Sequence, residues 1–524
     1  MQQLSGMDSM FLYADTHRAP LEVGSLQIYD PSTAPNGKVR FKEVLATFQS
    51  RMGRFPMFRQ KLVEVPLSLD HPYWTEDEDF DLEYHVRHIS LPKPGDWSQL
   101  MAQVARLQAR SLDRSRPMWI AHVIEGLGDI PGLKRGAFAL YMKMHHSMID
   151  GVTGRDVQAA LHDLEPIQAD VRSYQPSAGP GTGTEPNRWN LVAKAPLSAL
   201  AKSTRLTLGL LRATPGLVRA GIRMRSKPGD PVPRTPFNEG RVSPNRVVDG
   251  RIFDLATMKQ ISAAVPEMTV NDVALCVVAG AMRGYLKANK ALPEESLVVG
   301  CPINVGTDED ARSGRGNLLT IMTVPVHTEV ADPVQRLKAI HRETLGAKAA
   351  TEDMGARTLT EIPLNLPAPI ARNLFPLLAE IAVRTQSLTF NTMVTNVAGI
   401  QKPVYLSGAR MIRMMGLGPV IDQAGIFHTV FSYDGMVAIT VTACRKMLPD
   451  AAAYADQLEA SFRELEAAAL GASRPPRKVT RKKRRKVTKK AAKKTAARRA
   501  SSTRKTTARK ARSKAGNGTA AAAR

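Results

Sequence analysis

Cysteine is scarce in this 524-residue chain, where Cys276, Cys301 and Cys444 lie far apart. They form no CxxC pair and no even framework, so the sequence predicts neither a disulfide scaffold nor a thiolate zinc site. Long hydrophobic runs are also missing, since the longest, residues 273–282, is far short of the roughly 20 residues that span a bilayer. The N-terminus lacks a basic start followed by an apolar core. We therefore expect no signal peptide, no transmembrane helix and a cytoplasmic location.

Acidic residues are absent from two strongly basic segments. Residues 474–524 carry 22 Lys or Arg, residues 186–229 carry nine, and setting both aside turns the net charge of +25 into −6. The first segment cannot bury apolar surface, so we expect a disordered tail able to bind anionic lipid or DNA phosphates. In the second, leucines at helical spacing lie beside arginines. This pattern suits either a helix on an anionic lipid surface or an interdomain crossover packed on the protein.

The pattern of apolar residues predicts an α/β protein with two domains, because 524 residues exceed what one core usually holds. Strands are expected at 25–30 and 136–146 with a helix at 97–112, and later strands at 318–328 and 436–445 with a helix at 269–289. Changes in composition then divide the chain into four parts. These are an N-terminal domain at 1–165, a Pro/Gly-rich and basic crossover linker at 166–239, a C-terminal domain at 240–472 and the tail at 473–524.

Two adjacent histidines, His145 and His146, end the predicted strand 136–146, and Asp150 and Gly151 follow them. One interpretation is a polar patch in which both rings satisfy hydrogen bonds. A metal site is not predicted, because no Cys or His partner stands at metal-ligand spacing. A nucleophilic triad is not predicted either, because no GxSxG elbow occurs. The remaining chemistry is a histidine acting as general base on a hydroxyl or amine, which a pKa near ~6.5 suits.

The order HHxxxDG resembles the active-site motif of acyltransferases built like chloramphenicol acetyltransferase, which condensation domains of peptide synthetases share. Three further segments are RPMWIAHVIEGL with Pro117 and Trp119, VNDVAL with Asn271 and Asp272, and TNVAGI with Asn396. In this order, over residues 4–470, they are similar to the bacterial wax ester synthase/acyl-CoA:diacylglycerol acyltransferase family. The chain departs from that pattern where Met118 replaces a leucine and where TNVAGI lacks two prolines.

The resemblance implies two chloramphenicol-acetyltransferase-like domains with a cleft between them that contains His146. His146 would be the general base, with His145, Asp150 and Gly151 supporting the motif. Further substrate or oxyanion candidates are Asn271, Asp272, Pro117, Trp119 and Asn396, and Asn271 has the alternative of a helix cap. The family implies no metal and no cofactor, with acyl-CoA as co-substrate. The acceptor would be diacylglycerol, giving triacylglycerol, or a fatty alcohol, giving a wax ester.

Two other functions stay open at this point. A condensation-type enzyme would take acyl groups from a carrier protein and would share HHxxxDG. A granule-associated or nucleic-acid-binding protein would act mainly through residues 474–524, which contain no aromatic residue to stack on bases. For the acyltransferase, we expect a peripheral position on the inner membrane or on lipid inclusions, with possible DNA contact through residues 474–524.

Overall fold

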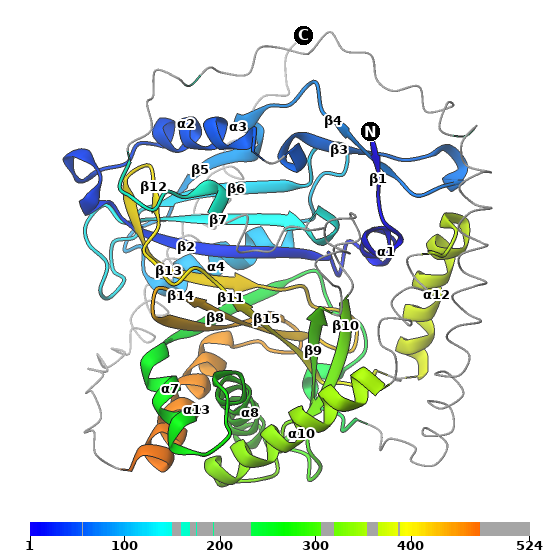
Figure 1. Ribbon diagram of the computed structural model, residues 1–524, viewed down its shortest axis with the longest axis vertical. Helices are drawn as coiled ribbons and strands as arrows, with labels where there is room; N and C mark the ends of the chain where they lie inside the picture. The colour runs from blue at the N-terminus through cyan, green and yellow to red at the C-terminus, as the bar shows by residue number, and fades with distance from the viewer. Residues whose placement is uncertain are drawn as a thin grey trace, which may run out of the picture. The chain divides into compact units, whose positions relative to one another are not determined.

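The computed structural model describes residues 1–54, 56–148, 159–167, 174, 192, 232–304, 319–353, 365–385 and 388–471. Apart from residue 192, the basic segment 186–229 lies outside the described residues, as does the tail 474–524. The described residues belong to one unit, Met1–Ala472, which is built on two six-stranded sheets (Figure 1). All three cysteines are buried free thiols. Among the described helices, none combines the length and hydropathy needed to cross a membrane.

The first sheet places the predicted histidine strand at its centre. Its strand order is β12–β13–β2–β7–β6–β5, with bounds Tyr405–Leu406, Ala409–Leu417, Glu22–Asp30, Phe138–His145, Trp119–Glu125 and Val86–Ser90. Strand β7 is buried along its whole length and pairs antiparallel with β2 and β6. Helix α4, Trp97–Ala109, packs its apolar stripe on β2, β6 and β7. Helices α1, Gly6–Ala14, and α2, Phe41–Met52, contribute to a separate apolar cluster with β6 and β7.

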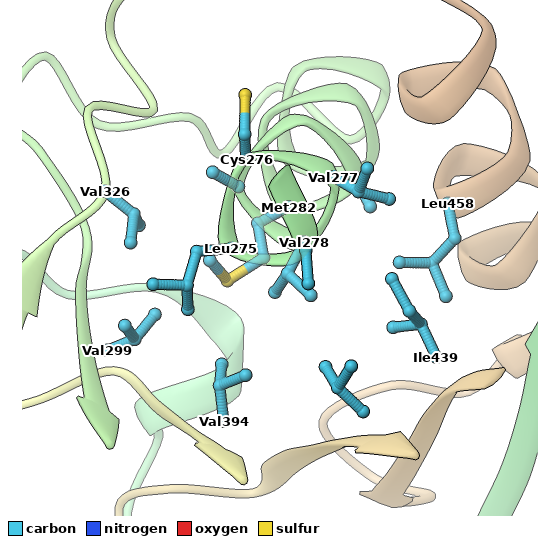
Figure 2. Close-up of a cluster of buried hydrophobic side chains, with 14 of the residues drawn as sticks. Leu275, Cys276, Val277, Val278, Met282, Val299, Val326, Val394, Ile439 and Leu458 are labelled. Atoms are coloured by element: carbon cyan, nitrogen blue, oxygen red, sulfur yellow. The ribbon is translucent and has the colours of Figure 1, made fainter. Parts of the chain in front are cut away.

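The second sheet carries a layer of helices on one face. Its order is β10–β9–β11–β14–β15–β8, with bounds Leu319–Pro325, Val298–Asn304, Thr392–Ala398, Ile426–Tyr433, Met436–Cys444 and Arg246–Asp254. The helices are α7, Leu255–Ala264, α8, Val270–Ala288, α10, Pro333–Asp353, and α13, Ala451–Leu470. Figure 2 shows α8 directing Leu275 and Val278 toward sheet residues such as Val394. These side chains are fully or almost fully buried, so Leu275→Ala would cost roughly 2–5 kcal/mol.

Strand β13 joins the two halves of the chain. It follows β11 in sequence, yet it pairs antiparallel with β2 of the first sheet, from Arg410↔Asp30 to Leu417↔Gly24. It also packs against β14 of the second sheet (Figure 1). A side-chain hydrogen bond adds to this junction, since Trp97 Nε1 donates to Asp249 Oδ1 at 2.8 Å. The two sheets therefore form one interlocked unit, and the domain boundaries at residues 165 and 240 stay a prediction.

The elements expected from the sequence are confirmed where the structure describes them. The strands predicted at 25–30, 136–146, 318–328 and 436–445 correspond to β2, β7, β10 and β15, and the helices at 97–112 and 269–289 to α4 and α8. Helix α8 begins where the sequence indicates, because Thr269 caps it and exchanges hydrogen bonds with Asp272 in a capping box. The cap is therefore Thr269, and the alternative of Asn271 as the helix cap is wrong.

Candidate active site

His146 lies at the point where β7 ends. The strand stops at His145, and a 3₁₀ turn, η5, runs from His146 to Met148. Main-chain hydrogen bonds hold both histidines from two sides, because His145 N donates to Met118 O at 3.0 Å and His146 N donates to Leu21 O at 3.0 Å. The chain positions flanking β6 and β2 thus fix the backbone of the HH pair. The predicted strand-to-loop junction is confirmed.

The His146 ring is half-buried and stacks on Phe11 of α1, with ring centroids 4.0 Å apart and an interplanar angle of 17°. Helix α1 is itself fixed by its cap, since the side chain of Ser5 accepts from Asp8 N at 3.1 Å. Burial, and then the neighbouring His145, lower the pKa of His146 to about 4, against a raising effect of its own main-chain carbonyl. The imidazole is therefore neutral near pH 7, which is the form that accepts a proton.

The two ring nitrogens of His146 have different surroundings. Nδ1 is buried, and no residue in the described part of the chain offers it a hydrogen bond of ordinary geometry. The group that favours the protonated ring, and so raises its pKa, is its own main-chain carbonyl. A proton on Nδ1 facing that carbonyl would leave Nε2 as the basic nitrogen, because a neutral imidazole carries one proton.

His145 is almost fully buried and makes different contacts. Its Nδ1 accepts from Ser147 N at 3.2 Å and lies 2.7 Å from Ser147 Oγ, so its proton belongs on Nε2. Nε2 lies 3.5 Å from Asp15 Oδ2, which is also 2.6 Å from an Arg114 nitrogen. Burial raises the pKa of Asp15, but His145 and Arg114 outweigh this and lower it below its ordinary value. His145 is thus held in one orientation by charged and polar neighbours.

A buried charge pair lies two residues back along β7. Lys143 Nζ is 2.7 Å from Glu22 Oε2, and the two side chains are 2% and 1% exposed. Burial lowers the pKa of Lys143, although Glu22 favours its charged form. Lys143 also donates to Leu107 O at 3.0 Å and to Arg110 O, while Leu112 N donates to Glu22 Oε1 at 2.6 Å. The pair ties β7 to β2 and to the end of α4.

These supporting residues were missed in the sequence analysis. None of Asp15, Arg114 and Glu22 was named as a site residue from the sequence, and each lies far from the HH pair along the chain. The available signal was Lys143, a charged residue inside an apolar strand next to the histidines. Because a lysine is almost never buried without a partner, its position predicts a nearby carboxylate but not which one.

The candidates Pro117 and Trp119 lie beside the HH pair but inside the core. Trp119 is the first residue of β6, and its register partner is Met144. Its Nε1 donates to Phe58 O at 2.8 Å, and its ring stacks on His85 at 4.7 Å. Pro117 and Trp119 are both buried, with Trp119 only 1% exposed. A substrate contact by the Trp119 side chain would require the core to open, so this segment supports the strand end through packing.

The candidates Asn271, Asp272 and Asn396 come together on the second sheet. Asn396 Nδ2 of β11 donates to Asn271 Oδ1 of α8 at 3.0 Å. Asp272 is buried, completes the cap of α8 and lies 3.0 Å from His341 Nδ1 of α10. Asp272 thus fixes the start of α8, which leaves the two asparagine amides as the exposed or half-exposed polar groups of this set. Their part in oxyanion binding stays a prediction.

The remaining motif residues, Asp150 and Gly151, lie outside the described residues, so their support of the motif stays a prediction. The described residues hold no cluster of three or more His, Cys, Asp or Glu side chains placed to bind a metal ion. The site that the structure does describe is a neutral, stacked histidine at a strand end. The adjacent His145 is held by Asp15 and Ser147, and the buried Lys143–Glu22 pair lies further back along the same strand.

Comparison with known proteins identifies the family of the chain. The wax ester synthase/diacylglycerol acyltransferase catalytic domain matches residues 4–274, and the C-terminal domain of the same family matches residues 315–466. The chain belongs to this family. A Mycobacterium tuberculosis protein, named provisionally as a diacylglycerol O-acyltransferase, is 32% identical over 89% of this chain and 90% of its own length. Another from the same organism, tgs2, is 31% identical over 88% of this chain and 98% of its own.

Solved structures agree with the family assignment. A wax ester synthase/diacylglycerol acyltransferase from Marinobacter aquaeolei VT8 is 28% identical, covers 89% of this chain and 100% of its own, and gives a TM-score of 0.62. The first condensation domain of the calcium-dependent antibiotic synthetase covers 89% and 96%, with 13% identity and a TM-score of 0.52. The second likeness shows the fold alone. Together they confirm the predicted α/β fold of the chloramphenicol-acetyltransferase type.

Proposed function

We propose that this member of the wax ester synthase/diacylglycerol acyltransferase family transfers a long-chain acyl group from acyl-CoA to a lipid alcohol. The acceptor is diacylglycerol, a fatty alcohol, or both. Nε2 of His146 takes the hydroxyl proton as that oxygen attacks the thioester carbonyl carbon. The tetrahedral intermediate collapses, the carbon–sulfur bond breaks, and the CoA thiolate leaves and recovers the proton from His146. No acyl-enzyme and no cofactor are needed, because the thioester is already activated.

The observation that carries this proposal is the state of the His146 ring. A base that must accept a proton near neutral pH has to be uncharged there, and a pKa of about 4 meets that condition. The low pKa makes the free base weak, so its effect depends on position. Stacking on Phe11 and the main-chain bond to Leu21 supply that position.

Competition between acceptors tests the reaction directly. Labelled long-chain acyl-CoA is offered with diacylglycerol and a fatty alcohol together, and the neutral lipids formed are separated. His146→Ala should lower turnover by about 10²–10⁴-fold, the usual contribution of a general base. His88→Ala, at an exposed histidine of β5, is the matched control and should keep turnover. Near-normal turnover in a folded His146→Ala protein would contradict the mechanism.

The acyl donor separates this function from a condensation-type reaction. Free acyl-CoA should support turnover in the purified chain without any carrier protein. If acyl transfer occurred only from a carrier-bound thioester, the condensation alternative would replace the proposal. The likeness to a condensation domain does not favour that outcome, because at 13% identity it concerns the fold.

We also propose that the basic tail, residues 474–524, holds the enzyme on an anionic membrane or lipid inclusion. Its 22 positive charges without one acid support electrostatic binding, at about 1 kcal/mol per basic residue close to such a surface. The same charges suit DNA phosphates, with an affinity that falls as salt rises. The isolated tail peptide should bind anionic vesicles and DNA in low salt and release both in high salt. Retention of the full particulate fraction by an enzyme lacking the tail would contradict this role.

A further inference from the structure

Helix α12, Ala368–Thr385, turns its apolar stripe outward. Ile370, Leu377, Leu378 and Ile381 are each about half exposed, and their spacing places them on one side of the helix. Only Ala368 and Ala371 of this helix are buried. A helix that packs on a protein core normally does the reverse, with its large aliphatic residues inside.

Leu67, which is 83% exposed, lies next to the same helix. It belongs to the 3₁₀ turn η4, Pro66–Ser68, against which α12 packs. A hydrogen bond of 2.7 Å from Arg372 to Ser68 Oγ fixes this contact. We call Leu67, Ile370, Leu377, Leu378 and Ile381 together the α12 surface. These five are half of the ten large hydrophobic side chains exposed in the described part of the chain, so their clustering calls for a partner.

The α12 surface is connected to the candidate active site through α1. Helix α12 packs on α1, as Figure 1 shows at the N-terminal end of the chain. The start of α12 is also anchored, because His71 Nε2 lies 2.9 Å from Leu366 O and His71 Nδ1 lies 3.1 Å from the Tyr13 hydroxyl. On the same helix α1, Phe11 stacks on the His146 ring. A lipid held on the outer face of α12 is thus separated from the proposed base by α12 and α1.

The charges around the α12 surface are paired with opposite charges. Glu380 pairs with Arg384 at 3.0 Å and with Arg241, and Arg372 lies 3.4 Å from Glu64. Each of these pairs is close enough to reduce the cost of moving its members toward a region of low dielectric. A surface with aliphatic side chains and paired charges is complementary to an uncharged lipid layer rather than to a strongly charged partner.

We propose that the α12 surface docks the protein onto the lipid phase that holds its acceptor alcohol, with the aliphatic side chains inserted among the acyl chains. This inference rests on the proposed function, since a diacylglycerol or fatty alcohol must be taken from a lipid layer. The exposed apolar area favours a lipid layer over a second copy of the chain as the partner of this surface. Five partly exposed aliphatic side chains offer on the order of 500 Å², as functional patches on monomers do, below the roughly 800 Å² that each partner buries in a standard interface.

Flotation with neutral vesicles tests the proposal. The full-length chain is mixed with phosphatidylcholine vesicles containing a small fraction of diacylglycerol, in 0.5 M salt, on the order of a 4 Å Debye length, which screens the basic tail. The test variant is Leu377→Gln/Leu378→Gln/Ile381→Gln, because glutamine is a good helix former and these side chains are exposed. The matched control is Leu164→Gln/Ile167→Gln/Leu345→Gln, which removes three exposed aliphatic side chains elsewhere.

The test variant should bind these vesicles at least tenfold more weakly than the unmodified chain, and the control should bind as the unmodified chain does. Turnover on vesicle-borne diacylglycerol, divided by turnover on a dissolved short-chain alcohol such as hexanol, should also fall at least tenfold in the test variant. Flotation measures vesicle binding independently of acyl transfer, so it tests docking even if no acyl transfer is found.

Three results would overturn the inference. The first is equal vesicle binding by the test variant and the unmodified chain. The second is an equal loss in the control variant, which would indicate general surface hydrophobicity. The third is a concentration-dependent dimer of the unmodified chain that the test variant abolishes, measured by light scattering, since a second copy would then be the occupant.

Discussion

Replacing Phe11 should change the pH dependence of the reaction, in addition to the loss of rate at neutral pH that follows from losing the stacking contact. The Phe11 ring covers one face of His146 at 4.0 Å, and burial is the largest cause of the low pKa of His146. In Phe11→Ala, water reaches that face and stabilises the imidazolium. The pKa of His146 should therefore rise from about 4 toward the ordinary value of a histidine.

The size of the change follows from the fraction of neutral imidazole. Burial is the main cause of the lowering of the pKa from 6.5 to about 4, and admitting water on one face should reverse about one to two units of it, or roughly 1.4–2.7 kcal/mol. At pH 5, His146 with a pKa of about 4 is roughly 90% neutral, whereas with a pKa near ~6 it would be only about 10% neutral. Near pH 8 both proteins hold a neutral base. Phe11→Ala should therefore lose up to about tenfold more kcat/KM at pH 5 than at pH 8.

The assay is kcat/KM for acyl-CoA with a dissolved alcohol, measured from pH 4.5 to 8.5, because this ratio reports the free enzyme's base. Each sample is returned to pH 7.5 and assayed again, to separate titration from acid unfolding. Phe11→Leu is the control, because leucine keeps an apolar side chain over the ring. It should move the pH at which kcat/KM falls on the acid side by less than half as much as Phe11→Ala does. Two findings would refute the reasoning. One is that the unmodified chain already loses activity below pH ~6.5. The other is that kcat/KM of Phe11→Ala falls on the acid side at the same pH as kcat/KM of the unmodified chain.

Three further outcomes are expected. Lys143→Met should lower the free energy of unfolding by roughly 3–5 kcal/mol, read from denaturant titration, because Glu22 is left buried without its partner. A loss below about 1 kcal/mol would show that water reaches the pair. Acid should destabilise the protein as pH falls from ~6.5 toward 4, because the unfolded chain protonates histidines that the folded chain keeps neutral. The histidines with lowered pKa values are His85, His122, His146 and His428. A melting temperature that stays constant over this pH range would contradict the prediction. Asp150→Ala and Asp150→Asn should lower turnover and melting temperature together, and loss of turnover alone, with an unchanged loop, would indicate a direct catalytic role.

Local pattern predicted four of the elements that position the site, β2, β7, α4 and α8, but not β6, β11 or α1. Apolar alternation placed β7 and its end at the histidines, and the Thr269 and Asp272 spacing placed the start of α8. The path of β13 could not be predicted in this way. Its pairing with β2 joins residues that are almost 400 positions apart, and no periodicity within either strand specifies that partner.

The contacts that hold the site were also beyond the sequence pattern. Asp15 and Arg114 approach His145 from loops whose positions depend on the whole first sheet. Trp119 was a candidate because of its motif, yet its side chain is buried and packs in the core beside the site. Motif position therefore predicted the neighbourhood of the site, while burial and partners decide what each side chain does there.

The same residues of strand β7 contribute to the stability of the fold and to the orientation of the base. Because side chains alternate along a strand, Tyr141, Lys143 and His145 share one face, and each has a buried polar partner: Gln108, Glu22 and Asp15. These partners come from α4, from β2 and from the end of α1, so the three pairs specify how these elements meet beneath the turn that carries His146. A buried polar pair is a weak source of net stability, but losing one partner is expensive. The arrangement therefore permits one register of β7 against β2 and one approach of α1, and that approach sets Phe11 against the His146 ring.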